Sequence, residues 1–199
     1  DYIPPPGDQR PQMIYSPATP ALITTHVLHR GQQPCMRPAL AALKTHDKHS
    51  LSLRPTALSC DLRLASEKST FAIPAAKLGL AYDYLGIKRL REIVGPARAK
   101  YIFYTARQFS SDEALKIGII EEVFKNDSFS KDIMSVLNSI NDNAPLTISS
   151  AKLAIDADPF DDEMFKKCKE LERICFSSKD YEEGRLAFSE KRKPVFKGH

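Results

Sequence analysis

The prolines of this chain are concentrated in its first third, where they restrict what the backbone can form. Nine of the fourteen prolines lie within residues 1–59, including the run Pro4-Pro5-Pro6. Proline lacks a backbone N–H and fixes its own φ angle, so it interrupts helices and central strands. Residues 1–56 are therefore predicted to form an atypical, irregular segment, with one short helix over residues 39–44 as the exception.

The charge composition changes near residue 60. Residues 1–59 contain only three acidic side chains, whereas residues 60–199 balance 22 acids against 23 bases. These charges are interleaved along helical segments, which is typical of solvated faces, so the net charge of +4 does not indicate a nucleic-acid partner. No apolar run approaches the roughly 20 residues that cross a bilayer. We therefore expect neither a nucleic acid nor a membrane as a partner.

The cysteines and histidines do not indicate a metal site. The four cysteines have no CxxC spacing, and the sequence contains no basic start followed by an apolar leader segment. We therefore expect a reducing compartment, either the cytoplasm or, in a eukaryote, the mitochondrial matrix. His26 and His29 lack a third ligand and lie among prolines, and the same argument applies to His46 and His49. No metal and no dissociable cofactor are predicted.

Apolar patterning downstream of Cys60 predicts α/β structure. Residues 61–65 alternate polar and apolar side chains, which predicts a half-buried strand. Residues 70–73 predict a second strand that stops at Pro74, so a short strand pair is expected. Helical spacing follows and is interrupted by Gly95-Pro96 before a second helix over residues 97–107.

The remaining segments are predicted to be mainly helical. Ser110 and Glu113 have the spacing of a capping box, which opens a short helix that ends at Gly118 and precedes a strand near residues 119–123. Apolar residues form one stripe over residues 129–140. Further helices are predicted over residues 146–157, 160–176 and 181–191. Helices that follow a β-containing layer indicate a docking or assembly region.

Short motifs follow one another in a fixed order through the last two thirds of the chain. They include CDLRLAS at residues 60–66, FAIP at 71–74, KLGL at 77–80, VGPA at 94–97, NAPL at 143–146, and AF with EKRK at 187–193. In order and spacing they resemble the enoyl-CoA hydratase/isomerase family, also called crotonases. The resemblance covers about 70% of the chain. It implies the α/β class, with a partial crotonase-like ββα spiral over residues 57–125 and a C-terminal helical assembly region over residues 126–199.

The resemblance also implies a substrate and an assembly. Crotonases bind an acyl-CoA thioester, need no further cofactor, and form trimers, often paired into hexamers, through their C-terminal helices. They stabilise an enolate with two backbone N–H groups, placed where negative charge develops on the thioester oxygen. One donor belongs to a motif resembling SAGxDL and the other to a glycine-rich turn before the ALxCDLRLAS stretch. Neither motif is found in this sequence.

The segment that precedes Ala57 departs most strongly from the family. Residues 49–59 occupy eleven positions where crotonases place a buried strand and a glycine turn in roughly twenty, and they contain no glycine. A shifted reading frame or a mispredicted exon upstream of Ala57 would produce such a junction. Asp1 in place of methionine is also what a fragment would show.

Ala75, Tyr82 and Asp83 bear on the family's chemistry, and Tyr82 is the candidate catalytic residue. Hydratases of the family use two glutamates, of which one lies in the missing segment and the other corresponds to Ala75, which cannot transfer a proton. Leu78-Gly79, Tyr82 and Gly86-Ile87 resemble the arrangement in methylmalonyl-CoA decarboxylase, which implies that Tyr82 is catalytic. The alternative for Tyr82 is a half-buried packing residue. Asp83 has two alternative roles, a carboxylate that faces the pocket and a helix-cap or turn aspartate, of which the cap or turn is predicted.

Phe188 and Lys191 match the terminal pair with which crotonases often reach the adenine and phosphate of CoA on a neighbouring subunit. Their alternative role is a frayed basic helix end, where lysine favours the negative end of the helix dipole. Three functional hypotheses stay open: an acyl-CoA-processing enzyme, a catalytically inactive subunit that still assembles, and the product of a misread gene whose N-terminal third does not fold.

Overall fold

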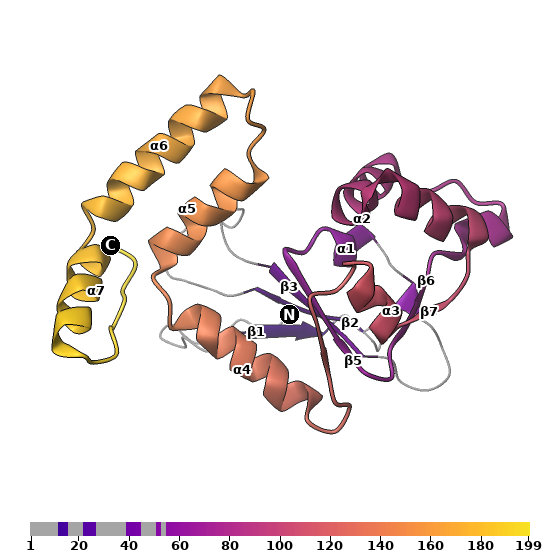
Figure 1. Ribbon diagram of the computed structural model, residues 1–199, viewed down its shortest axis with the longest axis horizontal. Helices are drawn as coiled ribbons and strands as arrows, with labels where there is room; N and C mark the ends of the chain where they lie inside the picture. Colours follow the sequence, from indigo (N-terminus) through magenta and orange to yellow (C-terminus); the bar gives the residue numbers. More distant parts are fainter. Residues whose placement is uncertain (1–11, 16–21, 27–38, 45–50, 53–54) are drawn as a thin grey trace. The chain divides into compact units, whose positions relative to one another are not determined.

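The computed structural model describes residues 12–15, 22–26, 39–44, 51–52 and 55–199 (Figure 1). Two compact units are present. The sheet unit comprises Met13–His26 and Ala39–Met134, and Ser135–His199 make up most of the helical unit. These bounds differ from the predicted division after residues 56 and 125, which stays a prediction.

The larger sheet of the sheet unit has a mixed topology. Its strand order is β1 (Gln12–Tyr15), β2 (Leu22–His26), β3 (Ala39–Leu43), β5 (Leu62–Ser66) and β8 (Glu122–Phe124). Strands β3, β5 and β8 run parallel, and β2 is antiparallel to β3. In the register of β3 with β5, Leu40 faces Leu62 and Leu43 faces Ala65.

Strand β3 replaces the short helix predicted over residues 39–44, and that prediction is wrong. Its sequence, ALAAL, is an apolar run too short for periodicity to separate a helix from a buried strand. Alanine and leucine favour helix, but pairing with β2 on one edge and β5 on the other overrides this weak preference. The irregular structure predicted for residues 1–56 also does not apply to the four strands β1 to β4.

Strand β5 was correctly placed by its sequence, but its predicted half-exposure is wrong. Residues Arg63 to Ser66 are all buried, as expected of a parallel strand covered on both faces. Arg63, only 4% exposed, is satisfied by hydrogen bonds from its Nε to the Ile119 carbonyl (2.6 Å) and from its Nη1 to the Cys60 carbonyl (2.6 Å). The polar position in the alternating pattern is therefore a buried arginine, and each of its three guanidinium nitrogens donates a hydrogen bond.

The second predicted strand belongs to a different sheet. Strand β6 (Thr70–Ala72) lies between β4 (Leu51–Ser52) and β7 (Phe109–Ser110), parallel to the first and antiparallel to the second. Phe71 and Phe109 stack across this sheet with their ring centroids 5.8 Å apart. The short strand pair predicted from the sequence is thus divided between two sheets.

Helices of the sheet unit enclose its core. These are α1 (Pro55–Leu58), the 3-10 helix η2 (Pro74–Leu78), α2 (Tyr84–Thr105) and α3 (Ser111–Lys116). The predicted interruption of α2 is confirmed, because Gly95 has φ 78° and ψ 163° immediately before Pro96. The predicted capping box is also confirmed: the Glu113 N–H bonds the Ser110 hydroxyl, and the Ser110 N–H bonds the Glu113 carboxylate.

The C-terminal helices follow in the predicted order. They are α4 (Phe129–Asn141), α5 (Pro145–Asp156), α6 (Asp162–Phe176) and α7 (Lys179–Glu190), drawn from orange to yellow in Figure 1. The predicted stripe of α4 is confirmed by the burial of Phe129, Ile133 and Leu137. Helix α6 buries none of its residues fully. Among the described residues, no helix has the length and apolar character that a bilayer crossing requires.

Candidate functional site

Tyr82 lies on the short connection between η2 and α2, in the sheet unit. Gly79, in the left-handed conformation at φ 64°, ends η2, and the Asp83 carboxylate begins α2 by accepting a hydrogen bond from the Gly86 N–H at 2.9 Å. The predicted capping role of Asp83 is confirmed. The connection that carries Tyr82 is therefore fixed at both ends.

The Tyr82 ring is half-buried against the core of the sheet unit. It packs edge-to-face on Phe103, with ring centroids 5.4 Å apart and an interplanar angle of 83°. Such a pair is the favoured geometry for two aromatic rings and holds the phenol ring in one orientation. This contact is the packing role that the sequence left as the alternative, and the catalytic role of Tyr82 stays a prediction.

Ala75 lies in the first turn of η2 and is almost fully buried. Its carbonyl accepts hydrogen bonds from the N–H groups of Gly79 and Leu80, the latter at 3.0 Å. The methyl side chain joins the core cluster of the sheet unit. A buried alanine here offers no group for proton transfer.

Phe188 and Lys191 lie one turn apart at the C-terminal end of α7, in the helical unit. The Phe188 side chain is 88% exposed, although Ala187 beside it is buried. Lys191 adopts the left-handed conformation, at φ 55° and ψ 38°. The structure thus presents both predicted CoA-binding side chains at the surface of one helix end, and their binding role stays a prediction.

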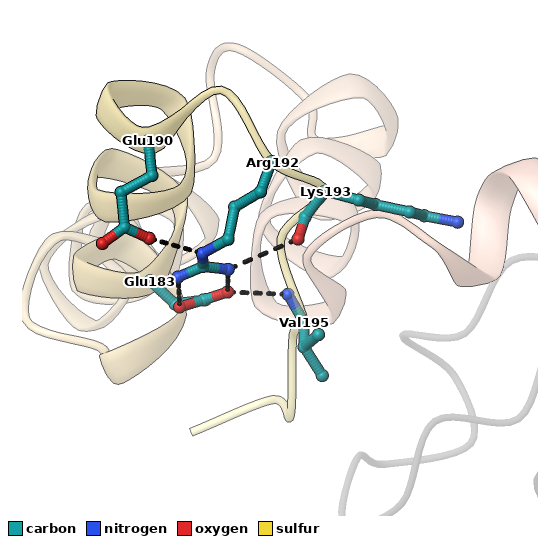
Figure 2. A network of polar contacts seen from close by, with 5 residues as sticks. All are labelled: Glu183, Glu190, Arg192, Lys193 and Val195. Carbon is teal, nitrogen blue, oxygen red and sulfur yellow. Dashed lines mark hydrogen bonds and ion pairs between the residues drawn. The ribbon is translucent and has the colours of Figure 1, made fainter.

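Arg192, which sequence reasoning overlooked, is the centre of the polar network in Figure 2. Its Nη1 and Nη2 atoms bond the two carboxylate oxygens of Glu183 at 2.6 and 2.9 Å, and its Nε bonds Glu190 at 2.6 Å. Bidentate arginine–carboxylate pairs of this kind are both strong and directional. The hydrogen bonds to Glu183 and Glu190 raise the pKa of Arg192.

Glu183 also holds the backbone beyond Arg192. Its carboxylate accepts a hydrogen bond from the Val195 N–H at 2.9 Å (Figure 2). The hydrogen bonds from Arg192, followed by the one from Val195, lower the pKa of Glu183 to about 2. The nine-residue separation of Glu183 and Arg192 matches no helical contact spacing, so the sequence carried no signal for this pair.

The last residues of the chain return along α7. The carboxylate of Asp180, which is buried in the first turn of α7, accepts hydrogen bonds from the N–H groups of Lys197 (2.7 Å) and Gly198 (2.8 Å). Lys193 pairs with Asp142 at 2.6 Å. The sequence position of Asp180 indicates only an acidic residue in the first turn of a helix, where the helix dipole favours negative charge. Its hydrogen bonds to the backbone of Lys197 and Gly198 depend on the folded tail.

A largely apolar groove of about 670 Å³ lies between α5, α6 and α7. Phe188 and Phe196 line it, together with Cys175. Burial raises the pKa of the Cys175 thiol, which favours the less reactive protonated form. Among the described residues, no group of three or more His, Cys, Asp or Glu side chains converges on a possible metal position. His29, His46 and His49 lie outside the described residues.

Known proteins share the sequence and the fold. Residues 55–199 match the sequence model of the enoyl-CoA hydratase/isomerase family. The chain is 34% identical over 146 residues to a short-chain-enoyl-CoA hydratase from Clostridium acetobutylicum, covering 69% of this chain and 53% of the relative. It is 32% identical over 146 residues to methylmalonyl-CoA decarboxylase from Escherichia coli, covering 71% and 56% of the two chains.

The structural comparison extends further into the N-terminal part. An enoyl-CoA hydratase/carnitine racemase from Magnetospirillum magneticum superposes with a TM-score of 0.71 at 27% identity, covering 83% of this chain and 61% of that one. The present chain spans about half the length of the two curated relatives described above.

Proposed function

The chain belongs to the enoyl-CoA hydratase/isomerase family of the crotonase superfamily, and we propose that it processes an acyl-CoA thioester through an enolate. The observation that carries this proposal is the match over residues 55–199, which includes the segments that hold Tyr82, Phe188 and Lys191. The thioester is the substrate, and the proposed reaction uses no other cofactor.

We propose a decarboxylase-like reaction in preference to hydration. Hydration requires a group that moves a proton to or from the substrate, and the family position for one such glutamate holds the buried Ala75. Decarboxylation breaks the bond between the α-carbon and the carboxylate, releases carbon dioxide and leaves the electron pair on the thioester enolate, whose α-carbon then takes a proton from water. The step needs a group that orients the carboxylate rather than a general base at this position. The fixed phenol of Tyr82 is suited to that role. A methylmalonyl-CoA decarboxylase is among the relatives, at about the same identity as the hydratases, so the preference rests on Ala75 and Tyr82.

A catalytically inactive subunit is the second candidate, and the exposed apolar surface of the helical unit supports the assembly that this candidate requires. Phe160, Phe165 and Phe176, which flank or belong to α6, are 93%, 61% and 63% exposed. Exposed apolar side chains at this density mark surfaces that bind another protein. We propose that this surface joins copies of the chain into a trimer, which would assemble whether or not catalysis is retained.

Titration calorimetry with acetyl-CoA and with a nonhydrolysable malonyl-CoA analogue tests the proposal, after light scattering has established the mass of the particle. Saturable binding of both ligands supports the acyl-CoA function. Absence of binding to a correctly assembled trimer would leave the inactive subunit as the function.

Decarboxylation of methylmalonyl-CoA and hydration of crotonyl-CoA are then compared in the wild type and in Tyr82→Phe. This substitution keeps the edge-to-face contact with Phe103 and removes only the hydroxyl group. The proposal expects a loss of decarboxylation of at least tenfold, with binding of acetyl-CoA unchanged. A Tyr82→Phe protein with full decarboxylase activity would exclude the catalytic role of Tyr82.

A further inference from the structure

The end of α7 is unusual because a lysine adopts a backbone conformation that favours glycine. The N–H of Arg192 bonds the Ala187 carbonyl at 3.0 Å, and the N–H of Lys191 bonds the Phe188 carbonyl at 3.3 Å. These two bonds form the Schellman motif that ends many helices, whose left-handed residue is usually glycine. Among the described residues, only Ala106 and Lys191 have a positive φ without being glycine.

Strained residues of this kind persist where surrounding contacts hold them in place, and they concentrate at functional sites. Glycine at position 191 would satisfy the backbone without strain, so the presence of lysine is consistent with a requirement for its ammonium group. Among the contacts that hold the reversal, those of Arg192 and Val195 both lead to Glu183. Glu190 and Asp142 add ion pairs to Arg192 and Lys193.

We propose that Glu183 is a positioning residue: by holding Arg192 and Val195, it fixes the chain reversal that presents Lys191 and Phe188 to the nucleotide part of a CoA thioester. The bidentate pair holds the Arg192 side chain against Glu183 of α7 (Figure 2). The adjacent Lys191 is exposed at the end of the helix. This inference rests on the proposed function, because it takes the adenine and phosphate of CoA as the ligand of this surface.

The C-terminal tail, residues 192–199, makes a second set of contacts with α7 that stabilises the same arrangement. Asp180 bonds two backbone N–H groups of the tail, at Lys197 and Gly198. The Phe196 ring lies against Gly184, where an added Cβ would be 3.5 Å from the ring. The tail therefore docks on α7 through two acidic side chains and one aromatic ring, and Glu183 is the member of this set that also contacts Arg192.

The test compares the affinities of CoA and 3′-dephospho-CoA, measured by titration calorimetry on the assembled full chain. The wild type is expected to bind CoA about tenfold more tightly, the ratio that one charge-assisted hydrogen bond to a phosphate typically gives. In Glu183→Ala the ratio is expected to approach one, while helicity by circular dichroism and mass by light scattering stay unchanged. Glu182→Ala, which removes an exposed carboxylate one residue earlier on α7, is the matched control and should keep the full ratio.

Two further variants separate positioning from folding. Lys191→Gly suits the left-handed conformation but lacks the ammonium group, so it should lose the tenfold ratio with α7 intact. Glu183→Gln keeps the size of the side chain and part of its hydrogen bonding, so it should fold if Glu183→Ala does not and should retain an intermediate ratio. Adding Lys191→Gly to Glu183→Ala should change the ratio no further, because both act on one interaction.

The outcomes distinguish this inference from the function on which it rests. A wild type that binds neither CoA nor 3′-dephospho-CoA overturns the proposed function and the inference together. A wild type that binds both equally overturns the phosphate contact and the inference, while leaving the acyl-CoA function in place. A tenfold ratio that persists in both Glu183 variants overturns the positioning role alone.

Discussion

The two units of this chain differ in how many of their apolar side chains are fully buried. In the sheet unit, β3 and β5 are buried along almost their whole length, and Phe71, Leu90 and Ile119 complete a closed core. In the helical unit, α6 has no fully buried residue and carries exposed phenylalanines. The sheet unit therefore encloses a core of its own, whereas α6 encloses none. Large apolar side chains are exposed on both units, including Leu85 and Tyr104 on α2 of the sheet unit.

Truncating a core residue of the sheet unit is expected to have the largest effect. Leu40 on β3 is fully buried, so Leu40→Ala should lower the free energy of unfolding by about 3 kcal/mol, through lost burial and a residual cavity. Urea denaturation followed by circular dichroism measures this change. Leu85→Ala, at an exposed position on α2, should cost less than about 0.5 kcal/mol. Equal costs for the two variants would contradict a closed core around β3.

A charge on the exposed face of α6 should act on assembly instead of folding. Phe165→Asp is expected to weaken subunit association by about 2 kcal/mol per contact, as removal of an aromatic interface anchor commonly does. Light scattering over a concentration series should show a lower mass, while the far-ultraviolet spectrum stays the same. Lys166→Asp introduces the same acid at a neighbouring exposed position and should leave the mass unchanged. An unaltered mass in Phe165→Asp would remove α6 from the proposed trimer interface.

Removing the partner of the buried arginine should have a smaller effect on the sheet unit. Arg63 Nη2 lies 2.5 Å from Glu121, so Glu121→Ala leaves a buried guanidinium without its carboxylate. We expect a loss of about 1–2 kcal/mol of unfolding free energy, limited because water reaches the Glu121 position. Glu122→Ala, at the next residue and first position of β8, is the control, since its side chain is exposed. A neutral Glu121→Ala would show that the two carbonyl bonds of Arg63 are sufficient to hold it.

Acidification should release the C-terminal tail, residues 192–199, from α7. The pKa of Glu183 is lowered from 4.5 to about 2, so its contribution is present above pH 4.5 and is lost as the pH falls through about 2. The protection of the Val195 amide, which is its hydrogen-exchange rate relative to an unstructured peptide at the same pH, should fall across that window. In Glu183→Gln the protection should already be reduced at pH 6, with no further loss attributable to position 183 on acidification. Equal protection of the Val195 amide at pH 6 and pH 2.5 in the wild type would contradict docking by the Glu183 carboxylate.

Features that depend on a few neighbouring residues could be predicted from the sequence. Ser110 with Glu113, Gly95-Pro96 and the apolar stripe of α4 each determine a local structure through their own spacing, and all three predictions are confirmed. The Asp83 cap is local in the same way. The family motifs similarly led to the fold class, because they lie at fixed positions along the chain.

Features that join distant residues could not be predicted. Residues 39–43 have the composition of a helix, and only the edges offered by β2 and β5 make them a strand. The strands near residues 64 and 71 are close in sequence but enter different sheets. No sequence pattern indicated the contact between Glu183 and Arg192 either, because it depends on a chain reversal at Lys191, which is not a glycine.

The sequence by itself determined the family, the succession of helices after residue 129 and the absence of a glutamate at position 75. Each of these features depends only on residue types or on the spacing of residues that are close in sequence. Only the tertiary structure decided which strands share a sheet, that Arg63 is buried and satisfied, and how the tail docks on Asp180 and Glu183. These three features have the same physical reason. Backbone polar groups and buried charges need hydrogen-bond or ion-pair partners, and the fold brings those partners from distant parts of the chain.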